Sequence, residues 1–353
     1  MPTDTAIRFE QAFSRFDATK PILVVTHNDA DGLSAGAIFQ RAFAALRRAS
    51  EVRVLGRGES AWDDAIQAEW RDRDLGGMIV ADLGTRGGPL GTDATTILID
   101  HHVPTGVPDG VTVLSGFDED PIPTSSLLAL RCAAPLTGND DLLWLAAVGL
   151  IGDLGDKAPF EALATARARF GVTALKDLVA LVNAPRRASA GDAGPALQLL
   201  LQAESPKDAL KGSHPERALL QAAREEVKAA LEIGKRQPPR VVGDVALIAL
   251  DTACQIHPLV AQAWRMRLKD KIVIAANTGY RPGWVHFATR SATGRNLIEF
   301  LRTVRPEGAD DHYGNGHEQA TGGALRTQDW PEFLDRLGFS PAPWGLRARS
   351  PPA

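Results

Sequence analysis

Four short apolar runs near the amino terminus constrain the fold of this chain more than any other feature. They lie at residues 22–25, 52–55, 78–81 and 97–99. Segments with apolar residues at helical spacing, at 33–48 and 61–71, separate the first three runs. Continuous apolar strands that alternate with helices are typical of a parallel sheet covered on both faces. The sequence therefore predicts an α/β fold with a doubly wound, mostly parallel sheet in its N-terminal part.

Acidic residues and histidines follow these predicted strands at their carboxyl ends. In chain order they are His27, Asp29, Asp31, Asp82, Asp100, His101 and His102. A further acidic residue, Asp153, follows a predicted helix at 142–151. Open α/β sheets bind ligands at the carboxyl edge of their strands, so we expect these side chains to converge. Each cluster alone is more often a solvated loop or a helix cap, but their shared position favours one common site.

The residue types in these clusters predict a site for divalent metal ions. Alternate residues of an extended loop point the same way, so His27, Asp29 and Asp31 can face one point. Carboxylate oxygen combined with imidazole nitrogen suits Mn²⁺, Mg²⁺ or Fe²⁺ better than it suits thiophilic metals. The clusters supply more such groups than one ion needs, which predicts two ions. Paired ions that activate a shared water and clamp phosphoryl oxygens catalyse phosphoester hydrolysis, which is the reaction class we expect.

The rest of the chain divides into a helical region and a second α/β part. Residues 159–237 are almost wholly helical in pattern, and the prolines within 237–240 break the last helix. Runs at 245–250, 271–276 and 284–289 predict strands of a smaller C-terminal α/β domain. The expected organisation is an N-terminal domain at 1–158, a helical extension and connector at 159–237, a C-terminal domain at 238–340 and a tail at 341–353.

Composition narrows the class of protein. A net charge of −4 argues against a protein that coats long nucleic acids through phosphate contacts. The balance reverses within 280–305, which is rich in arginine, so phosphate contacts are expected there. Cys132 and Cys254 have neither disulfide-like nor zinc-like spacing. No run has membrane-spanning length or the pattern of a secretory signal, and together these features predict a cytoplasmic protein.

Taken in order, the motifs resemble those of the DHH phosphoesterase superfamily, named for the triplet that occurs here at Asp100-His101-His102. The other matching motifs of the N-terminal part are Asp29-Ala30-Asp31-Gly32, Asp82 and Gly152-Asp153. The associated substrate domain has an Arg-Ser segment and a glycine-rich loop, which resemble Thr289-Arg290-Ser291 and Gly314-Asn315-Gly316-His317. The resemblance covers nearly the whole chain. It implies a catalytic domain at 1–158 and a substrate-binding domain at 238–340.

The resemblance further implies a ligand set for two Mn²⁺ ions, with Mg²⁺ or Fe²⁺ as alternatives. Asp82 would bridge the two ions. The other ligands would be His27 and Asp29 for one ion, and Asp31, His101 and Asp153 for the other. These assignments follow the family motifs position by position.

Roles in catalysis and substrate binding are implied in the same way. His102 would stabilise the charge that develops on the scissile phosphate. Asp100 would orient a histidine without binding metal. The far part of the substrate would be held by Arg290, Ser291, Asn315, Gly316 and His317.

Three functions are compatible with the resemblance. The preferred one is a metal-dependent phosphodiesterase that hydrolyses short single-stranded oligonucleotides or nucleotide phosphates, because the two expected domains resemble the two-domain branch of the family that acts on such substrates. The second is a single-strand exonuclease similar to RecJ that acts on longer DNA or RNA. The third is a non-catalytic replication scaffold, which the complete ligand set disfavours. No membrane partner is expected, and the protein could act as a homodimer.

Overall fold

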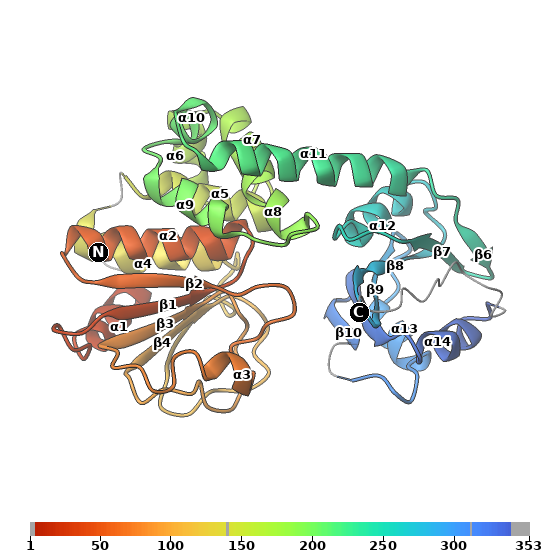
Figure 1. The fold of residues 1–353 in the computed structure, drawn as a ribbon, viewed down its shortest axis with the longest axis horizontal. Helices are drawn as coiled ribbons and strands as arrows, with labels where there is room; N and C mark the ends of the chain where they lie inside the picture. Colours follow the sequence, from red (N-terminus) through yellow and green to blue (C-terminus); the bar gives the residue numbers. More distant parts are fainter. Residues whose placement is uncertain (1–3, 139–140, 311–312, 340–353) are drawn as a thin grey trace, which may run out of the picture. The chain divides into compact units, whose positions relative to one another are not determined.

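The computed structural model describes residues 4–138, 141–310 and 313–339 (Figure 1). The chain forms two compact units, which we call unit 1 (Met1–Arg186 and Ala190–Arg224) and unit 2 (Arg187–Ser189 and Glu225–Ala353). The chain passes from unit 1 to unit 2 for the last time within a long helix, α11 (Glu216–Lys235). The boundary expected at the proline-containing segment 237–240 therefore lies further along the chain than this crossing. The roles assigned to the domains expected from the sequence remain predictions.

A five-stranded sheet forms the centre of unit 1. Its strands are all parallel, and their order is β2-β1-β3-β4-β5. They are β1 (Ile22–Thr26), β2 (Ser50–Val54), β3 (Gly77–Ala81), β4 (Thr96–Asp100) and β5 (Thr112–Ser115). The predicted α/β fold with a parallel sheet is therefore confirmed. The sequence did not predict the edge strand β5, because β5 is short and most of its residues are only half-buried.

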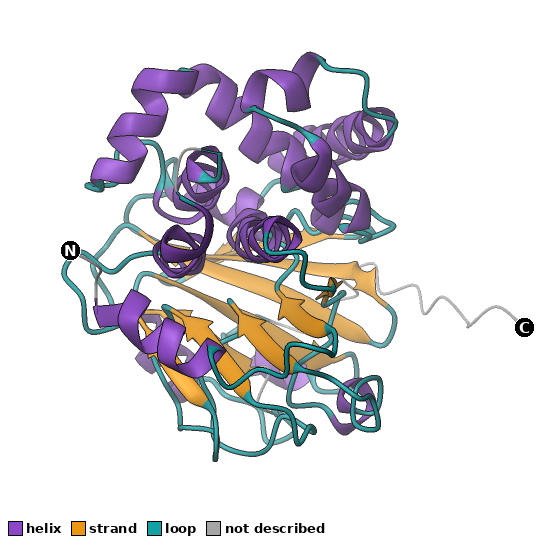
Figure 2. Ribbon diagram, turned by 90° about the vertical axis from the view of Figure 1, so that its left-hand side faces the viewer, coloured by secondary structure: helices purple, strands orange, loops and turns teal. Residues whose placement is uncertain are grey.

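One face of this sheet is covered by α1 (Asp4–Phe13), α2 (Ala30–Ala45) and α4 (Ser125–Thr137), as Figures 1 and 2 show. Apolar residues of these helices share one core with alternate strand residues such as Val24 and Ile99. The alternation of a strand places every second side chain on this face. Because α2 begins directly after the loop that follows β1, the predicted metal-binding loop lies at its amino end.

The opposite face is covered by a short helix, α3 (Asp64–Gln67), and by loops. Trp70 is buried there, and its Nε1 donates a hydrogen bond to the carbonyl oxygen of Leu90 at 2.8 Å. The sequence predicted a helix over 61–71, which was wrong for most of that range. The segment folds in turns around the indole because the indole packs under the sheet and bonds to a distant loop.

The strand order reverses beside β1. The connection through α2 leads from β1 to β2 on one side, and the connection through α3 leads to β3 on the other. Such a reversal opens a crevice at the carboxyl ends of the two central strands, where ligands of doubly wound sheets bind. His27 and Asp82 follow these two strands.

A helical layer completes unit 1 and confirms the helical pattern predicted after residue 158. It contains α5 (Leu143–Leu154), α6 (Glu161–Phe170), α7 (Val172–Val182), α8 (Ala184–Arg187), α9 (Gly194–Gln202), α10 (Pro206–Lys211) and the first part of α11. Among the helices of the described residues, none combines the length and the hydropathy needed to cross a bilayer.

Unit 2 contains a six-stranded mixed sheet with the order β10-β11-β9-β8-β7-β6. Among its described strands, only β7 and β8 pair in parallel. The strands are β6 (Arg240–Val242), β7 (Val245–Leu250), β8 (Ile272–Arg281), β9 (Trp284–Ser291), β10 (Tyr313–His317) and β11 (Ala320–Arg326). The helices are α12 (His257–Arg265), α13 (Leu297–Thr303) and α14 (Trp330–Arg336). A separate apolar core around Phe287 and Trp330 stabilises this unit.

Candidate metal centre

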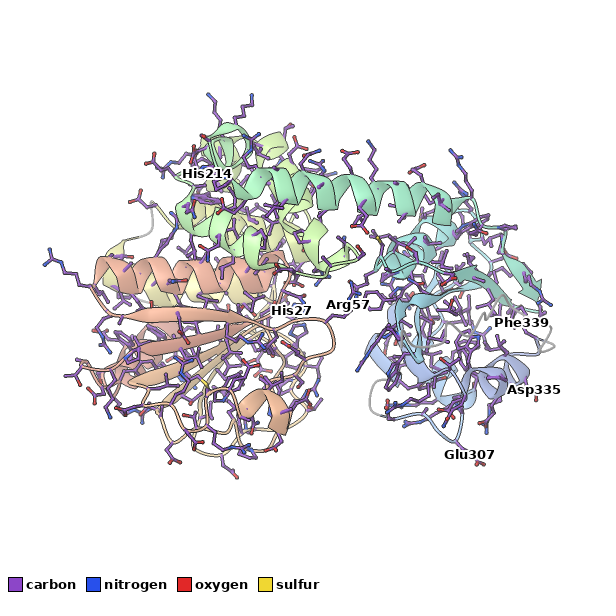
Figure 3. All side chains as sticks on the ribbon, in the orientation of Figure 1. His27, Arg57, His214, Glu307, Asp335 and Phe339 are labelled. Carbon is purple, nitrogen blue, oxygen red and sulfur yellow. The ribbon has the colours of Figure 1, made fainter. Side chains whose placement is uncertain are left out.

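The loop between β1 and α2 holds the first part of the site. His27 lies just beyond the end of β1 (Figure 3), and its Nδ1 is 3.0 Å from Oδ2 of Asp29. Asp29 is the N-cap of α2, because its Oδ1 accepts hydrogen bonds from the backbone N–H groups of Asp31 and Gly32 at 3.2 and 3.1 Å. Capping thus uses one carboxylate oxygen and leaves the other to face His27.

Asp82 lies directly after β3, between two histidines. Its Oδ2 is 3.6 Å from Nδ1 of His27, and its Oδ1 is 3.4 Å from Nε2 of His101. The Asp82 backbone has a φ of 64°, in the left-handed region that costs a residue with a Cβ roughly 1–2 kcal/mol. Strain of this kind persists where the surroundings fix the residue, and it occurs often at functional sites. Each carboxylate oxygen of Asp82 thus faces a different histidine.

His101 gathers the second part of the site. It follows β4, and its Nε2 is 3.3 Å from Oδ2 of Asp153 and 3.9 Å from Oδ2 of Asp31. Asp153 comes from the last turn of α5, whereas Asp31 lies in the first turn of α2. Three elements that are distant in sequence thus converge on one imidazole ring.

Asp31 is held in place by the amino end of α4. Its two carboxylate oxygens accept hydrogen bonds from the backbone N–H groups of Ser125 and Ser126 at 2.7 and 3.0 Å. Unpaired N–H groups at a helix start favour a negative charge there. Gly149 leaves room for this contact, since a Cβ at that position would lie 2.4 Å from Oδ1 of Asp31. The side chain of Ser125 also donates to Oδ1 of Asp82 at 3.0 Å.

Asp100 and His102 form a separate pair beside these groups. Asp100 is fully buried at the end of β4, and its Oδ1 is 2.8 Å from Nδ1 of His102. Its Oδ2 accepts a hydrogen bond from the hydroxyl of Thr85 at 3.1 Å. The structure therefore contains the contact by which Asp100 was predicted to orient a histidine.

Two residues that the sequence did not single out also contact the site. Arg186 in α8 donates from Nη1 to Oδ2 of Asp29 at 3.0 Å. Asn183 caps the end of α7, and its Oδ1 accepts the backbone N–H of Ala30 at 3.0 Å. Both fix the amino end of α2 from more than 150 residues away in sequence. No local pattern in the sequence could have revealed a contact of that range.

Negative charge dominates this cluster. Burial alone would lower the pKa of both histidines, but neighbouring carboxylates outweigh it and raise the pKa of His27 to about 10 and that of His101 to about 11. Burial and the charges of Asp82 and Asp153 raise the pKa of Asp31 well above its usual range. Carboxylates at such short range oppose one another's ionisation unless cations lie among them.

The donor set fits divalent metal ions. Nε2 of His101 is buried and makes no hydrogen bond in the described structure, although three carboxylates surround it. Three groups of side chains each bring their ligand atoms within 4.8 Å of one another, namely His27 with Asp29 and Asp82, Asp31 with His101 and Asp153, and Asp82 with His101 and His102. Mn²⁺ and Mg²⁺ accept such a mixture of oxygen and imidazole donors. The first two groups correspond to the two ligand sets expected from the sequence.

Comparisons with known proteins identify the fold. No protein-family model and no curated protein matches this sequence. RecJ from Thermus thermophilus in complex with Mn²⁺ is similar with a TM-score of 0.71 and 20% identity, over 96% of this chain and 54% of that chain. A DHH domain from a member of the s1p family of ribosomal proteins is similar with a TM-score of 0.64 and 12% identity, over 94% and 88% of the two chains. This chain has the DHH fold.

Further structures with the DHH fold differ in length and in the activity that their names give. This chain spans about half of the Thermus RecJ chain, but it covers 94% of another RecJ exonuclease structure bound to manganese, with a TM-score of 0.67, 20% identity and 96% of this chain aligned. The pGpG-specific phosphodiesterase PggH from Vibrio cholerae has a TM-score of 0.51 and 14% identity, over 90% of this chain and 97% of PggH. At these identities the likeness establishes the fold alone.

Unit 2 of this DHH-fold chain carries the residues predicted to hold substrate. Arg290 is half-buried in β9, and its Nη1 donates to the carbonyl oxygens of Thr289 and Thr321 at 2.9 and 3.1 Å. The hydroxyl of Ser291 is buried and donates to the carbonyl oxygen of Lys271 at 3.2 Å. Both side chains thus already bond to the main chain. Their predicted roles toward substrate remain predictions.

The glycine-rich loop forms part of β10 and its turn into β11. Gly316 has a φ of 131°, and a Cβ there would lie 2.6 Å from the carbonyl oxygen of Ala320, so the position requires glycine. The backbones of Asn315 and His317 belong to β10, whereas their side chains lie outside the described structure. Trp284 and Phe287 of β9 are buried, so both rings pack within unit 2.

Proposed function

We propose that this protein is a metal-dependent phosphodiesterase that hydrolyses short oligonucleotides or nucleotide phosphates. The observation that carries the proposal is the convergence on Asp82 of two histidine-containing ligand sets at the carboxyl edge of a parallel sheet. Oxygens of Asp31, Asp82 and Asp153 lie 3.3 to 3.9 Å from Nε2 of His101, and this crowding of carboxylates around one buried ring nitrogen supports metal binding.

Two ions are expected in this site, and Mn²⁺ is the first candidate. His27 and Asp29 would hold one ion, Asp31, His101 and Asp153 would hold the other, and Asp82 would contact both. When bound, such ions lower the pKa of a water molecule toward neutrality and neutralise phosphoryl oxygens. The protein contributes the fixed positions of the ligands, because α4 holds Asp31 and Arg186 holds Asp29.

His102 is the residue that we assign to the scissile phosphate. Because Nδ1 faces Asp100, the other ring nitrogen remains available to the site. A donor aimed at the phosphoryl oxygens stabilises the charge that grows there in the transition state. Unit 2 is the part that we assign to the rest of the substrate, because a guanidinium such as that of Arg290 and the backbone N–H groups of a glycine-rich loop can bind anionic oxygens.

The length of the substrate is the second part of the proposal. Short substrates are favoured by the acidic net charge of −4 and by the likeness to PggH, whose name states that it acts on pGpG. The likeness to RecJ structures favours the alternative of a single-strand exonuclease, since one of them aligns over 94% of its own chain. The two activities share the metal chemistry and differ in the substrate that unit 2 admits.

The test is hydrolysis of end-labelled single strands of graded length. DNA and RNA from the dinucleotide upward, together with 3′-phosphoadenosine 5′-phosphate, are incubated with Mn²⁺, with Mg²⁺ or with a chelator. Asp82→Asn serves as the matched control because it keeps the shape of the side chain but removes the charge. Loss of only the shortest species in the wild type supports the proposal, whereas stepwise shortening of long strands supports the exonuclease.

The third possible outcome of this hydrolysis test is that the protein cleaves none of the substrates. If none of these substrates is hydrolysed with any metal, the phosphodiesterase proposal is wrong, and a scaffold function becomes the better account. Calorimetric titration of Mn²⁺ into the wild type and Asp82→Asn then determines whether the cluster still binds metal. Metal binding without hydrolysis would separate the metal centre from the proposed reaction.

A further inference from the structure

We propose that Thr85 is a positioning residue that fixes His102 through the buried carboxylate of Asp100. The inference deepens the proposed function and rests on it, because His102 is the residue assigned to the scissile phosphate. Thr85 lies in the loop after β3, three residues beyond Asp82, and is 2% exposed. Neither the metal ligands nor the triplet that names the fold includes it.

Two hydrogen bonds converge on the carboxylate of Asp100, one on each oxygen. The hydroxyl of Thr85 donates to Oδ2 of Asp100 at 3.1 Å, and Oδ1 of the same carboxylate is 2.8 Å from Nδ1 of His102. A carboxylate only accepts hydrogen bonds, so Nδ1 of His102 carries the hydrogen. Nε2 of His102 is then the nitrogen that remains for the site. The pair therefore selects both the tautomer and the orientation of the ring.

Asp100 cannot hold this orientation alone. It is fully buried, and a buried carboxylate is costly unless both of its oxygens have partners. Thr85 and His102 each take one oxygen. Without the Thr85 hydroxyl, Oδ2 of Asp100 has no donor and the carboxylate can rotate toward another one. The His102 ring, which bonds to this carboxylate, would then move with it. The Thr85 hydroxyl therefore acts on His102 indirectly, through the side chain of Asp100.

A second contact ties Thr85 to the segment that follows His102. The carbonyl oxygen of Thr85 accepts the backbone N–H of Thr105 at 2.9 Å. The loop that carries Asp82 and the loop that carries His102 are thus joined at Thr85 by its main chain as well as its side chain. Thr85 can therefore fix the position of the His102 ring relative to Asp82, although it contacts neither metal nor substrate itself.

The variants Thr85→Val and Thr85→Ser separate the hydroxyl from the volume of the side chain. Valine keeps the shape but cannot donate, whereas serine keeps the donor. Thr96→Val is the matched control, because Thr96 is also buried and starts the same strand that Asp100 ends. Its hydroxyl donates to the carbonyl oxygen of Ala94 at 3.0 Å, at the other end of β4 from Asp100.

In Thr85→Val we expect kcat to fall roughly 10-fold, the range for residues that orient a catalytic group. KM and the affinity for Mn²⁺ should stay within about twofold of the wild type, since the ligands and unit 2 are unchanged. Thr85→Ser should restore most of kcat, and Thr96→Val should retain it. A kcat for Thr85→Val equal to that of Thr96→Val, or no recovery with serine, would overturn the proposal.

A second readout does not depend on activity. In ¹⁵N-histidine-labelled protein, with the ring signals of His102 assigned through His102→Gln, the Nδ1–H tautomer should dominate in the wild type. Thr85→Val should shift or broaden these signals, whereas Thr96→Val should leave them in place. If the wild type hydrolyses no substrate, the proposed function fails, and this comparison still decides the role of Thr85. Unchanged His102 signals in Thr85→Val would overturn it.

Discussion

His101 in unit 1 and His257 in unit 2 are both buried, and each has a ring nitrogen that makes no hydrogen bond among the described residues. Their pKa values nevertheless move in opposite directions. Carboxylates around His101 outweigh its burial and raise its pKa to about 11. Burial, with His286, Arg290 and Arg187 as its charged neighbours, lowers the pKa of His257 to about 3. The same side chain thus lies among carboxylates in one unit and among basic groups in the other.

This contrast is consistent with the roles that we propose for the two units. Unit 1 gathers negative charge at the carboxyl edge of its sheet, which suits cations. Unit 2 places Arg290 and further basic residues around a neutral histidine, which suits an anionic ligand. A phosphodiester substrate with bound metal needs both kinds of surroundings. Four experiments can refute or refine this contrast between the units.

The largest effect is expected for Asp82→Asn. Loss of the bridging charge should lower kcat/KM roughly 10³-fold or more, the scale found when a central catalytic group is removed. The metal-free variant should be no more stable than the wild type, because burial and the charge of Asp29 are outweighed by His101 and His27, which lower the pKa of Asp82, so the fold favours its ionised form. Steady-state kinetics and thermal unfolding without metal measure the two quantities. Activity within tenfold of the wild type would contradict a bridging role.

Arg186→Met should have the next largest effect. Removing the guanidinium leaves Oδ2 of Asp29 without its donor from α8 and should weaken Mn²⁺ binding or activity by roughly 10- to 100-fold. Isothermal titration with Mn²⁺ measures the affinity directly. The exposed residue Arg167 on α6 provides the control, since Arg167→Met removes an equal charge from a different helix. Equal affinities in the two variants would show that Arg186 acts only through net charge.

The pH dependence of stability tests whether the pKa of His257 in unit 2 is lowered, in contrast to the raised pKa of His101. His257 has a pKa of about 3 in the folded protein against 6.5 for an ordinary histidine. Because folding favours its neutral form, its contribution is complete above pH 6.5 and is lost as the pH falls toward 3, by at most about 1.4 kcal/mol per pH unit. Denaturant unfolding of the wild type and His257→Gln between pH 7 and 4 measures this difference. Parallel pH curves would contradict a buried neutral His257.

The smallest effect is expected for Ser291→Ala. Its hydroxyl bonds to the main chain at Lys271, so its removal should lower the free energy of unfolding by about 1 kcal/mol. KM should stay within about twofold of the wild type. Denaturant unfolding and steady-state kinetics give the two values. An increase of tenfold or more in KM with unchanged stability would instead support the role toward substrate that the sequence predicted.

The sequence predicted the candidate site largely because parallel strands end at one edge of a sheet. His27, Asp82 and His101 each follow a predicted strand, so their convergence required only the parallel order that the structure confirms. The predicted helix at 61–71 failed for the opposite reason, since the burial of Trp70 against a distant loop overrides local helical spacing. Local patterns predict an element correctly here when all of its residues share the same surroundings, as in the buried strands of the parallel sheet.

Residue types and their order determined the α/β class, the carboxyl edge and the metal chemistry, because strand periodicity and ligand preference are local properties. Tertiary structure alone decided which oxygen of each carboxylate faces the site. The amino end of α4 holds Asp31, and Arg186 holds Asp29. Tertiary structure also set the left-handed backbone of Asp82 and the contact of Thr85 with Asp100. Such contacts join segments that only the packed fold brings together, so no spacing along the chain can encode them.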